Sequence, residues 1–218
     1  METAALHGVP RSFDRAGLDR PAAEAAPGLL GALLVREADT TRILARVVEV
    51  EAYDEDDPAS HSASGRSSRN ASMFAAAGTA YVYRSYGLHW CLNVSIGPPG
   101  TGAAVLFRAA VPVVGEPSIR ARRPRVQRAP ALLRGPGCLT AGLDIDGPRH
   151  DGLDLLARDG HLLLQADGWR PAAGAVRVGP RVGVTRAAER PWRWYLADEP
   201  AVSQYRRSPR LPLPQPDS

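Results

Sequence analysis

The chain has 218 residues, an apolar fraction of 44% and a formal net charge of +4. This length and apolar content suit one globular domain and exclude a chain that is disordered throughout. The positive charge is too small to identify a nucleic-acid partner by itself, although all 27 basic residues are Arg. A GC-rich coding sequence explains this bias, yet each guanidinium can also hold a phosphate with two donors.

The two cysteines, Cys91 and Cys138, form neither a zinc-ligand spacing nor a disulfide framework. The chain opens without the charged and apolar segments of a signal peptide, and no apolar run is long enough to span a bilayer. The sequence therefore favours a soluble, cytoplasmic protein that has no membrane partner.

The first half of the chain alternates between apolar and polar segments. Residues 1–27 are rich in Ala, Arg and Pro, and we expect a partly flexible segment with a short helix over 20–26. Residues 29–35 predict a buried helix end that runs into a strand. The β-branched and apolar residues of 42–53 predict a longer strand, and the polar residues 54–72 predict a long loop.

The second half begins with a predicted β-hairpin over 79–96, whose turn contains Tyr86 and Gly87. A third long strand is expected over 103–114. Further on we expect a helix with a loop over 119–133, a turn over 135–137, a short helix over 139–143, and strands over 153–155, 162–164, 181–184 and 192–196. From Gln204 the Arg, Pro and Ser content predicts a disordered tail over 204–218, so that one domain spans 28–203.

Two charged residues interrupt apolar strands and need an explanation. If 42–53 is a strand, Glu51 shares one face with Glu49 and Tyr53. A carboxylate buried there is costly unless it is paired or used, although spacing alone leaves an exposed edge-strand glutamate equally open. Arg108 interrupts a similar run, and a buried arginine must be paired.

Ordered sequence blocks over residues 29–203 resemble the alkyladenine (methylpurine) DNA glycosylase family. The blocks are EVEAY at 49–53, HS at 61–62, MF at 73–74, GTAYVYRSYG at 78–87, CLNV at 91–94, VLFRA at 105–109, RGPG at 134–137, RVGV at 181–184 and PWRWY at 191–195. One block alone would be a weak signal, whereas their common order over most of the chain is specific. Cys138 stands where the family commonly has Lys.

The resemblance implies a single mixed α/β (α+β) domain. Its sheet is curved and largely antiparallel, with flanking helices and a projecting β-hairpin, similar to the C-terminal domain of methionyl-tRNA formyltransferase. The implied activity is that of a monofunctional DNA glycosylase, which flips an alkylated or deaminated purine out of duplex DNA and hydrolyses its N-glycosidic bond. The expected partner is double-stranded DNA, approached from the minor groove by a monomer, and no metal or cofactor is needed.

The same resemblance assigns the chemistry of bond cleavage to three positions. Glu51 is the expected general base, because a carboxylate beside the anomeric carbon stabilises an oxocarbenium-like sugar and deprotonates the attacking water. Arg108 is expected near that water and the phosphate of the flipped nucleotide, where it can also pair with Glu51. The main-chain carbonyl of Val182 is expected to hold the same water.

The resemblance also assigns four base-binding positions and one position that inserts into the duplex. Tyr53, His61 and Tyr83 are expected to sandwich it, because electron-poor alkylated purines stack well on electron-rich rings. Asn93 would oppose the amino group of normal guanine. Tyr86 would fill the gap that the flipped nucleotide leaves. From the residues alone, half-buried strand tyrosines, an inconsequential loop histidine, a backbone-bonded asparagine and a Tyr86 folded onto the hairpin remain open.

The arginine-rich cluster, residues 120–128, is either a phosphate contact or a solvated face. Three other functions also remain open: a module that binds lesions without cleaving them, an RNA-binding domain, and a lyase-type glycosylase. The absence of Lys argues against the lyase, which needs an amine nucleophile. The preferred purine stays open among 3-methyladenine, 7-methylguanine, hypoxanthine and ethenoadenine.

Overall fold

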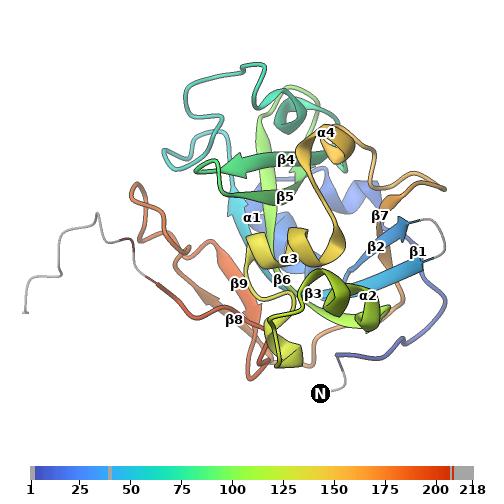
Figure 1. Ribbon diagram of the computed structural model, residues 1–218. Coiled ribbons are helices and arrows are strands. Elements are labelled where there is room, and N and C mark those ends of the chain that lie inside the picture. Colours follow the sequence, from blue (N-terminus) through green and yellow to red (C-terminus); the bar gives the residue numbers. More distant parts are fainter. Residues whose placement is uncertain (1–2, 39–40, 207, 209–218) are drawn as a thin grey trace, which may run out of the picture.

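The computed structural model describes residues 3–38, 41–206 and 208 as one α+β domain. Its nine strands form a single sheet of antiparallel pairs in the order β1-β7-β2-β3-β6-β5-β4, and β9 joins β3 while β8 joins β9. The sheet curls rather than lying flat, and the helices are short and lie outside it (Figure 1).

The element bounds show how short most of the secondary structure is. The strands are β1 (Arg11–Ser12), β2 (Leu33–Ala38), β3 (Thr41–Tyr53), β4 (Ala80–Ser85), β5 (His89–Ile96), β6 (Ala103–Val114), β7 (Leu162–Ala166), β8 (Val176–Gly179) and β9 (Arg193–Leu196). The α-helices are α1 (Ala22–Ala25), α2 (Glu116–Arg122), α3 (Pro136–Leu143) and α4 (Gly147–His150). The 3-10 helices are η1 (Arg15–Leu18), η2 (Ala26–Leu29), η3 (Ala71–Phe74) and η4 (Ala129–Ala131).

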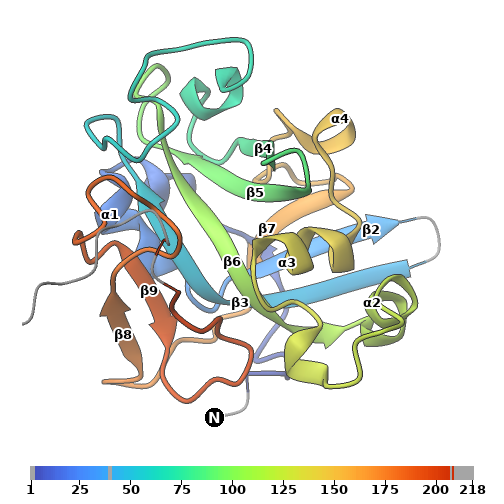
Figure 2. The same ribbon diagram turned by 60° about the vertical axis from the view of Figure 1, so that its left-hand side comes forward.

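Strand β3 pairs with three other strands, and it carries the residues on which the site depends. Along one edge it pairs with β6, while on the other edge its first half pairs with β2 and Glu49 to Glu51 pair with β9. Register shifts on either side of Glu49 bend the strand at this point. The second half of β3 is therefore enclosed by β6 and β9, and β9 lies beside it in Figure 2.

The β4–β5 hairpin projects a tyrosine from its turn. Leu88 N donates to Ser85 O at 2.9 Å, and the two residues between them, Tyr86 and Gly87, have φ values of +49° and +70°. Two positive φ values are typical of a type I′ turn, which matches the twist of hairpin strands. Glycine adopts this conformation freely, but tyrosine does so at a cost, and such strain often accompanies function.

The core fills the space between the curled sheet and the helices. Phe107 and Leu92 are fully buried from β6 and β5, and α3 packs against both strands. A close approach at Gly142 of α3 favours glycine, because an added Cβ would lie 2.4 Å from Leu133 Cδ2 and the buried Leu133 side chain would have to shift. This packing holds β5 and β6 rigidly, and therefore also the polar side chains that they carry toward the site.

Most predicted elements are confirmed. The short helix before residue 26, the transition into β2, the strand β3, the hairpin, β6, β7 and β9 all occur within a few residues of the predicted bounds. The helix expected over 119–133 is α2, which ends at Arg122 and is followed by a loop with η4. The turn expected over 135–137 is the start of α3, since Gly135 has a φ of +89° and Pro136 opens the helix.

Two predicted strands are wrong. Residues 153–155 form a turn with only one isolated bridge, from Asp154 to Thr79, because a short buried apolar run does not distinguish a strand from a packed loop. Residues 181–184 form a bend, since Gly183 has a φ of +76° and interrupts the extended backbone. The sequence analysis also missed β1, β8 and α4.

The two ends of the chain differ in what the structure describes. At the N-terminal end, the carbonyls of Thr3 and Ala5 accept hydrogen bonds from the buried Arg46 guanidinium. At the C-terminal end, 204–206 and Ser208 are described, and the remaining positions of the expected tail lie outside the described residues. The division of the chain into flexible ends and a domain over 28–203 stays a prediction.

Candidate active site

A cavity of about 960 Å³ opens where the loop after β3, the β4–β5 hairpin, β6 and the segment after β8 meet. Its wall is rich in aromatic and basic side chains. Among the lining residues are Tyr53, His61, Arg69, Tyr81, Tyr83, Arg84, Tyr86, Cys91, Asn93, Arg108, Val182 and Arg186. A concave site of this size with convergent polar groups is the usual place for a small ligand or an extruded base.

Glu51 lies one layer behind the cavity wall and is fully buried. Its Oε1 accepts a hydrogen bond from Val182 N at 2.7 Å, and its Oε2 accepts from Tyr53 Oη at 2.9 Å and from Arg108 Nη1 at 3.1 Å. All three donors line the cavity. Glu51 is therefore a buried, hydrogen-bonded carboxylate and not an exposed edge-strand residue.

The strand geometry explains why Arg108 meets Glu51. Glu51 pairs across the ladder with Leu106 of β6, so the residue two positions further along β6 points to the same face. Burial alone would lower the pKa of Arg108, but the charges of Glu51 and Glu49 outweigh it and raise that pKa. The predicted pairing of Arg108 with Glu51 is confirmed, and the guanidinium stays charged.

Val182 contacts the Glu51 carboxylate through its main chain. The identity of the Val182 side chain could not have predicted this contact. Its N–H donates to Glu51, whereas the sequence analysis assigned its carbonyl to a water molecule. The N–H and the carbonyl of Val182 belong to two different peptide units, so this bond fixes the N–H toward Glu51 and not the direction of the carbonyl. The role of the carbonyl stays a prediction.

The predicted aromatic residues gather on one side of the cavity. His61 and Tyr83 meet edge to face, with ring centroids 4.4 Å apart, and His61 Nδ1 lies 2.8 Å from Tyr81 Oη. Burial, aided by the charge of Arg69, lowers the pKa of His61, so its imidazole is neutral at pH 7. A purine between two rings needs about 7 Å, so a sandwich requires the His61 ring to move away from Tyr83.

Comparison with known proteins shows the family of the chain. Residues 16–200 match the family model of methylpurine-DNA glycosylase (MPG). Relatives named "Putative 3-methyladenine DNA glycosylase" are similar over most of their length. The protein of Rhodococcus jostii (strain RHA1) is 46% identical over 86% of this chain and 82% of the relative. That of Nocardia farcinica (strain IFM 10152) is 47% identical over 86% and 89%, respectively.

A third relative extends the match over more of the chain. The protein of Granulibacter bethesdensis (strain ATCC BAA-1260 / CGDNIH1) bears the same name and is 46% identical over 92% of this chain and 90% of its own length. The chain belongs to the methylpurine-DNA glycosylase family. As a member, it is a DNA glycosylase, a hydrolase that acts in DNA repair.

The hairpin of this methylpurine-DNA glycosylase presents Tyr86 outward at the rim of the cavity. The side chain is 80% exposed, so it does not fold back onto the hairpin. Leu88, two residues further on, is 79% exposed. Large exposed apolar side chains at a loop tip mark a contact surface.

Asn93 lines the cavity, and a hydrogen bond to the main chain holds its side-chain amide. Its Nδ2 donates to Tyr81 O at 2.9 Å, and the residue is 3% exposed. The backbone bond that the sequence left open as an alternative therefore exists. It also fixes the amide orientation, which a residue that screens purines would need.

Sequence reasoning missed a second buried pair behind Tyr53. Arg181 lies 4.7 Å from the Tyr53 ring centroid and 5.3 Å from that of Trp192, and its Nη2 donates to Asp57 Oδ1 at 3.0 Å. Both charged partners have fully buried side chains. The signal was the acidic run 54–57, which needed a cation, but only the fold shows which carboxylate is buried.

The arginine-rich cluster lies apart from the cavity. Arg120 pairs with Glu116 at 2.7 Å, Arg123 donates to Cys138 Sγ at 3.1 Å, and Arg125 and Arg128 are exposed. A phosphate contact in this cluster stays a prediction. Within the described ranges, no three His, Cys, Asp or Glu residues are grouped to hold a metal, and no helix is long and apolar enough to cross a membrane.

Proposed function

We propose that this methylpurine-DNA glycosylase is monofunctional and hydrolyses the N-glycosidic bond of alkylated or deaminated purines in duplex DNA. The product is an intact abasic site. The observation that carries the proposal is the buried Glu51 carboxylate, held by Tyr53, Arg108 and Val182 directly behind the cavity wall. A module that only binds lesions has no use for a buried carboxylate at this place.

In the proposed reaction, the bond from the purine nitrogen to C1′ breaks and its electron pair leaves with the base. Water attacks C1′ and transfers a proton to Glu51, whose negative charge also stabilises the oxocarbenium-like sugar. Among the described residues, Glu51 Oε1 accepts one hydrogen bond, from Val182 N, which leaves a lone pair for this water. Arg108 and the Val182 carbonyl orient the water.

In this proposal the damaged base enters the cavity after leaving the stack. Tyr53 and Tyr83 supply ring faces, and His61 turns to close on the base and donate or accept a hydrogen bond. Asn93 disfavours normal guanine, whose amino group meets an amide fixed by its bond to Tyr81. Tyr86 enters the duplex from the minor groove and occupies the vacated position.

The proposal includes the setting of the reaction. The substrate is double-stranded DNA with damaged purines, and the proposed enzyme is a monomer, since one chain suffices to supply every proposed site residue. Its relatives are bacterial, and chromosomal DNA of bacteria lies in the cytoplasm, where we propose that it acts.

The decisive experiment is a single-turnover assay with duplexes that contain hypoxanthine or ethenoadenine, and with methylated DNA for release of methylpurines. Wild type should release base, and Glu51→Gln should lower the rate by about 10³-fold while lesion binding is largely kept. Glu37→Gln is the matched control, because Glu37 is another strand glutamate paired with an arginine, but its side chain is 42% exposed. It should react at the wild-type rate.

Three outcomes would contradict the proposal. Turnover by Glu51→Gln at the wild-type rate would remove Glu51 as the base. Lesion binding without base release by wild type would indicate a recognition module, and release from RNA but not DNA would indicate another substrate. Strand nicking without added alkali or amine would indicate lyase chemistry, which a chain without Lys would have to perform through its N-terminal amine.

A further inference from the structure

A second carboxylate, Glu49, is buried two residues before Glu51 and does not line the cavity. Its Oε1 accepts from Arg108 Nε at 2.9 Å, from Arg193 Nε at 2.7 Å and from Ser203 Oγ at 2.7 Å. Its Oε2 accepts from Ser203 N at 2.8 Å. Glu49 accepts four hydrogen bonds but lies outside the cavity wall, so we expect it to act on the site through the residues that it contacts.

Arg108 is the link between the two carboxylates. It donates Nε to Glu49 and Nη1 to Glu51, so it makes one contact with each and a bidentate pair with neither. Arg193 supplies the second positive charge, and its Nη2 donates to Ser203 O at 2.7 Å. We call these four charged side chains, Glu49, Glu51, Arg108 and Arg193, the buried quartet. Its formal charges cancel.

We propose that Glu49, held by Arg193 and Ser203, is a positioning residue that keeps Arg108 divided between two carboxylates and so leaves Glu51 able to accept a proton. The proposal rests on the proposed role of Glu51 as the base. Without Glu49, the guanidinium would be free to pair with Glu51 through two parallel bonds, the strongest arrangement available to it. Two positive charges would then face one carboxylate, which would hold a proton less readily.

The other groups around Glu51 do not titrate between pH 5 and 9. Burial raises the pKa of Tyr53 and of Tyr83, and it raises the pKa of Cys91 to about 11. Burial also opposes the charge of Glu49, but Arg108 and Arg193 outweigh it and the pKa of Glu49 is lowered. Glu49 and Arg108 therefore keep their charges over the range in which a glycosylase works. His61 lines the same cavity, and an experiment must separate its titration from that of Glu51.

The test compares two substitutions that unbalance the quartet in opposite directions. Glu49→Gln removes a negative charge, and the acid limb of the single-turnover rate should move to lower pH, with a lower plateau. Arg193→Gln removes a positive charge, and the acid limb should move to higher pH. At this separation each shift should be on the order of one pH unit. The double variant Glu49→Gln/Arg193→Gln should return the limb toward the wild-type position.

A direct readout keeps the result independent of catalysis and of His61. The carboxyl carbon of Glu51 can be followed by NMR in protein labelled with ¹³C-glutamate and assigned with Glu51→Gln. Its titration midpoint should move as the acid limb does. Asp167→Asn is the matched control, since Asp167 forms a fully buried pair with Arg46 elsewhere on the sheet. It should lower the melting temperature without moving either midpoint.

The results separate this inference from the proposed function. Active wild type with the Glu51 midpoint unmoved in Glu49→Gln and Arg193→Gln, or moved in the same direction in both, overturns the positioning role alone. Inactive wild type overturns the proposed function, and the NMR midpoints still decide whether Glu49 controls Glu51. If Glu49→Gln does not fold, Arg193→Gln carries the test, because it keeps both carboxylates, and a midpoint that does not rise overturns the inference.

Discussion

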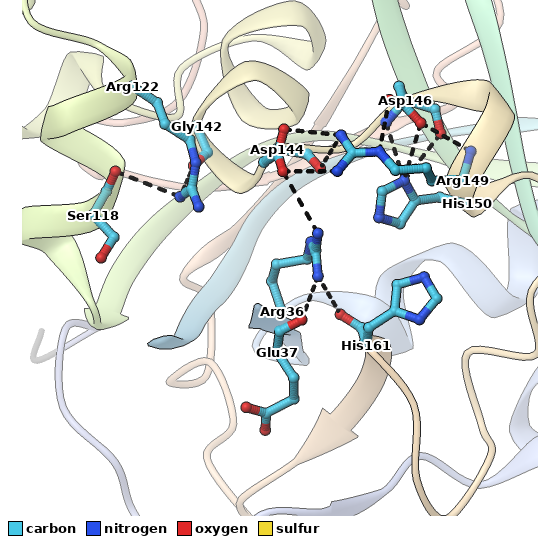
Figure 3. A network of polar contacts seen from close by, with 10 residues as sticks. All are labelled: Arg36, Glu37, Ser118, Arg122, Gly142, Asp144, Asp146, Arg149, His150 and His161. Carbon is cyan, nitrogen blue, oxygen red and sulfur yellow. Dashed lines mark hydrogen bonds and ion pairs between the residues drawn. The ribbon is translucent and has the colours of Figure 1, made fainter. Parts of the chain in front are cut away.

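The buried quartet and the network in Figure 3 use the same chemistry, arginine against carboxylate, but the ion pairs of Arg149 in that network are partly exposed. The residues of this distal network are Arg36, Asp144, Asp146, Arg149 and His150. In its Arg149–Asp144 pair the side chains are 48% and 40% exposed, against 8% and 0% in Arg108–Glu51. Water screens the exposed pair, whereas the buried pair keeps both its interaction energy and its fixed orientation.

The two networks also differ in how each arginine uses its donors. Arg149 forms a bidentate pair with Asp144 and a further bond to Asp146, so its charge is satisfied within the network. Arg108 divides its donors between two carboxylates and lines a cavity. Under the proposed function, ion pairing alone would not distinguish the site from the distal network, whereas burial beside the cavity would.

The largest difference is expected when each network loses its central arginine. Arg108→Gln should lower the glycosylase rate by about 10²–10³-fold and the free energy of unfolding by about 3 kcal/mol, because buried carboxylates lose their partner. Arg149→Gln should change the free energy of unfolding by less than about 1 kcal/mol and leave the rate unchanged. Single-turnover assays and urea unfolding measure both. Equal effects in Arg108→Gln and Arg149→Gln would contradict the difference between the buried quartet and the distal network.

A smaller effect is expected at the hairpin. Tyr86→Ala should weaken binding to lesion-containing duplexes by about 1–2 kcal/mol, because the ring no longer stacks in the helix. Leu88→Ala removes a side chain of similar exposure two residues away and should cost less, since it has no ring to stack. Fluorescence anisotropy at fixed salt compares the two. Wild-type affinity in Tyr86→Ala would remove the wedge role.

The pKa of His61 tests the influence of the Arg69 charge at the cavity. Burial and the charge of Arg69 lower the pKa of His61, so Arg69→Gln should raise it. As the pH is lowered, the imidazole would then become protonated at a higher pH than in wild type. Lesion binding that requires the neutral imidazole should therefore also weaken at a higher pH. NMR titration of the imidazole gives the pKa directly. A pKa that stays unchanged would show that burial alone perturbs His61.

The smallest effect on the free energy of unfolding is expected in the distal network. Hydrogen bonding to Arg149 lowers the pKa of Asp144 despite partial burial. The ionised carboxylate therefore stabilises the folded state above its unfolded pKa of about 4, and this contribution is lost as the pH falls through the lowered folded pKa. Asp144→Asn should cost less than about 1 kcal/mol at pH 7 and less still at pH 2. Urea unfolding at both values, repeated in high salt, measures the loss.

Local patterns predicted the long elements well, and they failed where side chains or glycine override the pattern. Strand β6 matches its predicted bounds, since its apolar run is long and ends at Gly115, which has a φ of +80°. The segment 181–184 looked like a strand, yet Arg181 turns inward to Asp57 and Gly183 bends the backbone. A buried salt bridge between residues 124 positions apart leaves no local trace in the sequence.

The candidate site shows the same division between local and tertiary information. The period-two alternation of a strand places Glu49, Glu51 and Tyr53 on one face, and the bond from Tyr53 Oη to Glu51 agrees with it. The presence of Arg108 in an apolar run predicted a buried pair, which the structure contains. No periodicity could indicate that Glu49 and Glu51 share one arginine, because that depends on a β6 register shifted by bulges.

The sequence by itself determined the family and the strand-rich α+β fold, and it supplied the residues proposed to perform the chemistry, because ordered motifs and strand alternation are properties of neighbouring positions. Only the tertiary structure decided that Glu51 lies one layer behind the cavity, that His61 touches Tyr83, and that Glu49 and Arg193 complete a neutral quartet around Arg108. These facts depend on contacts between distant segments. The free energy of such contacts comes from burial and mutual orientation, which the order of residues along the chain does not contain.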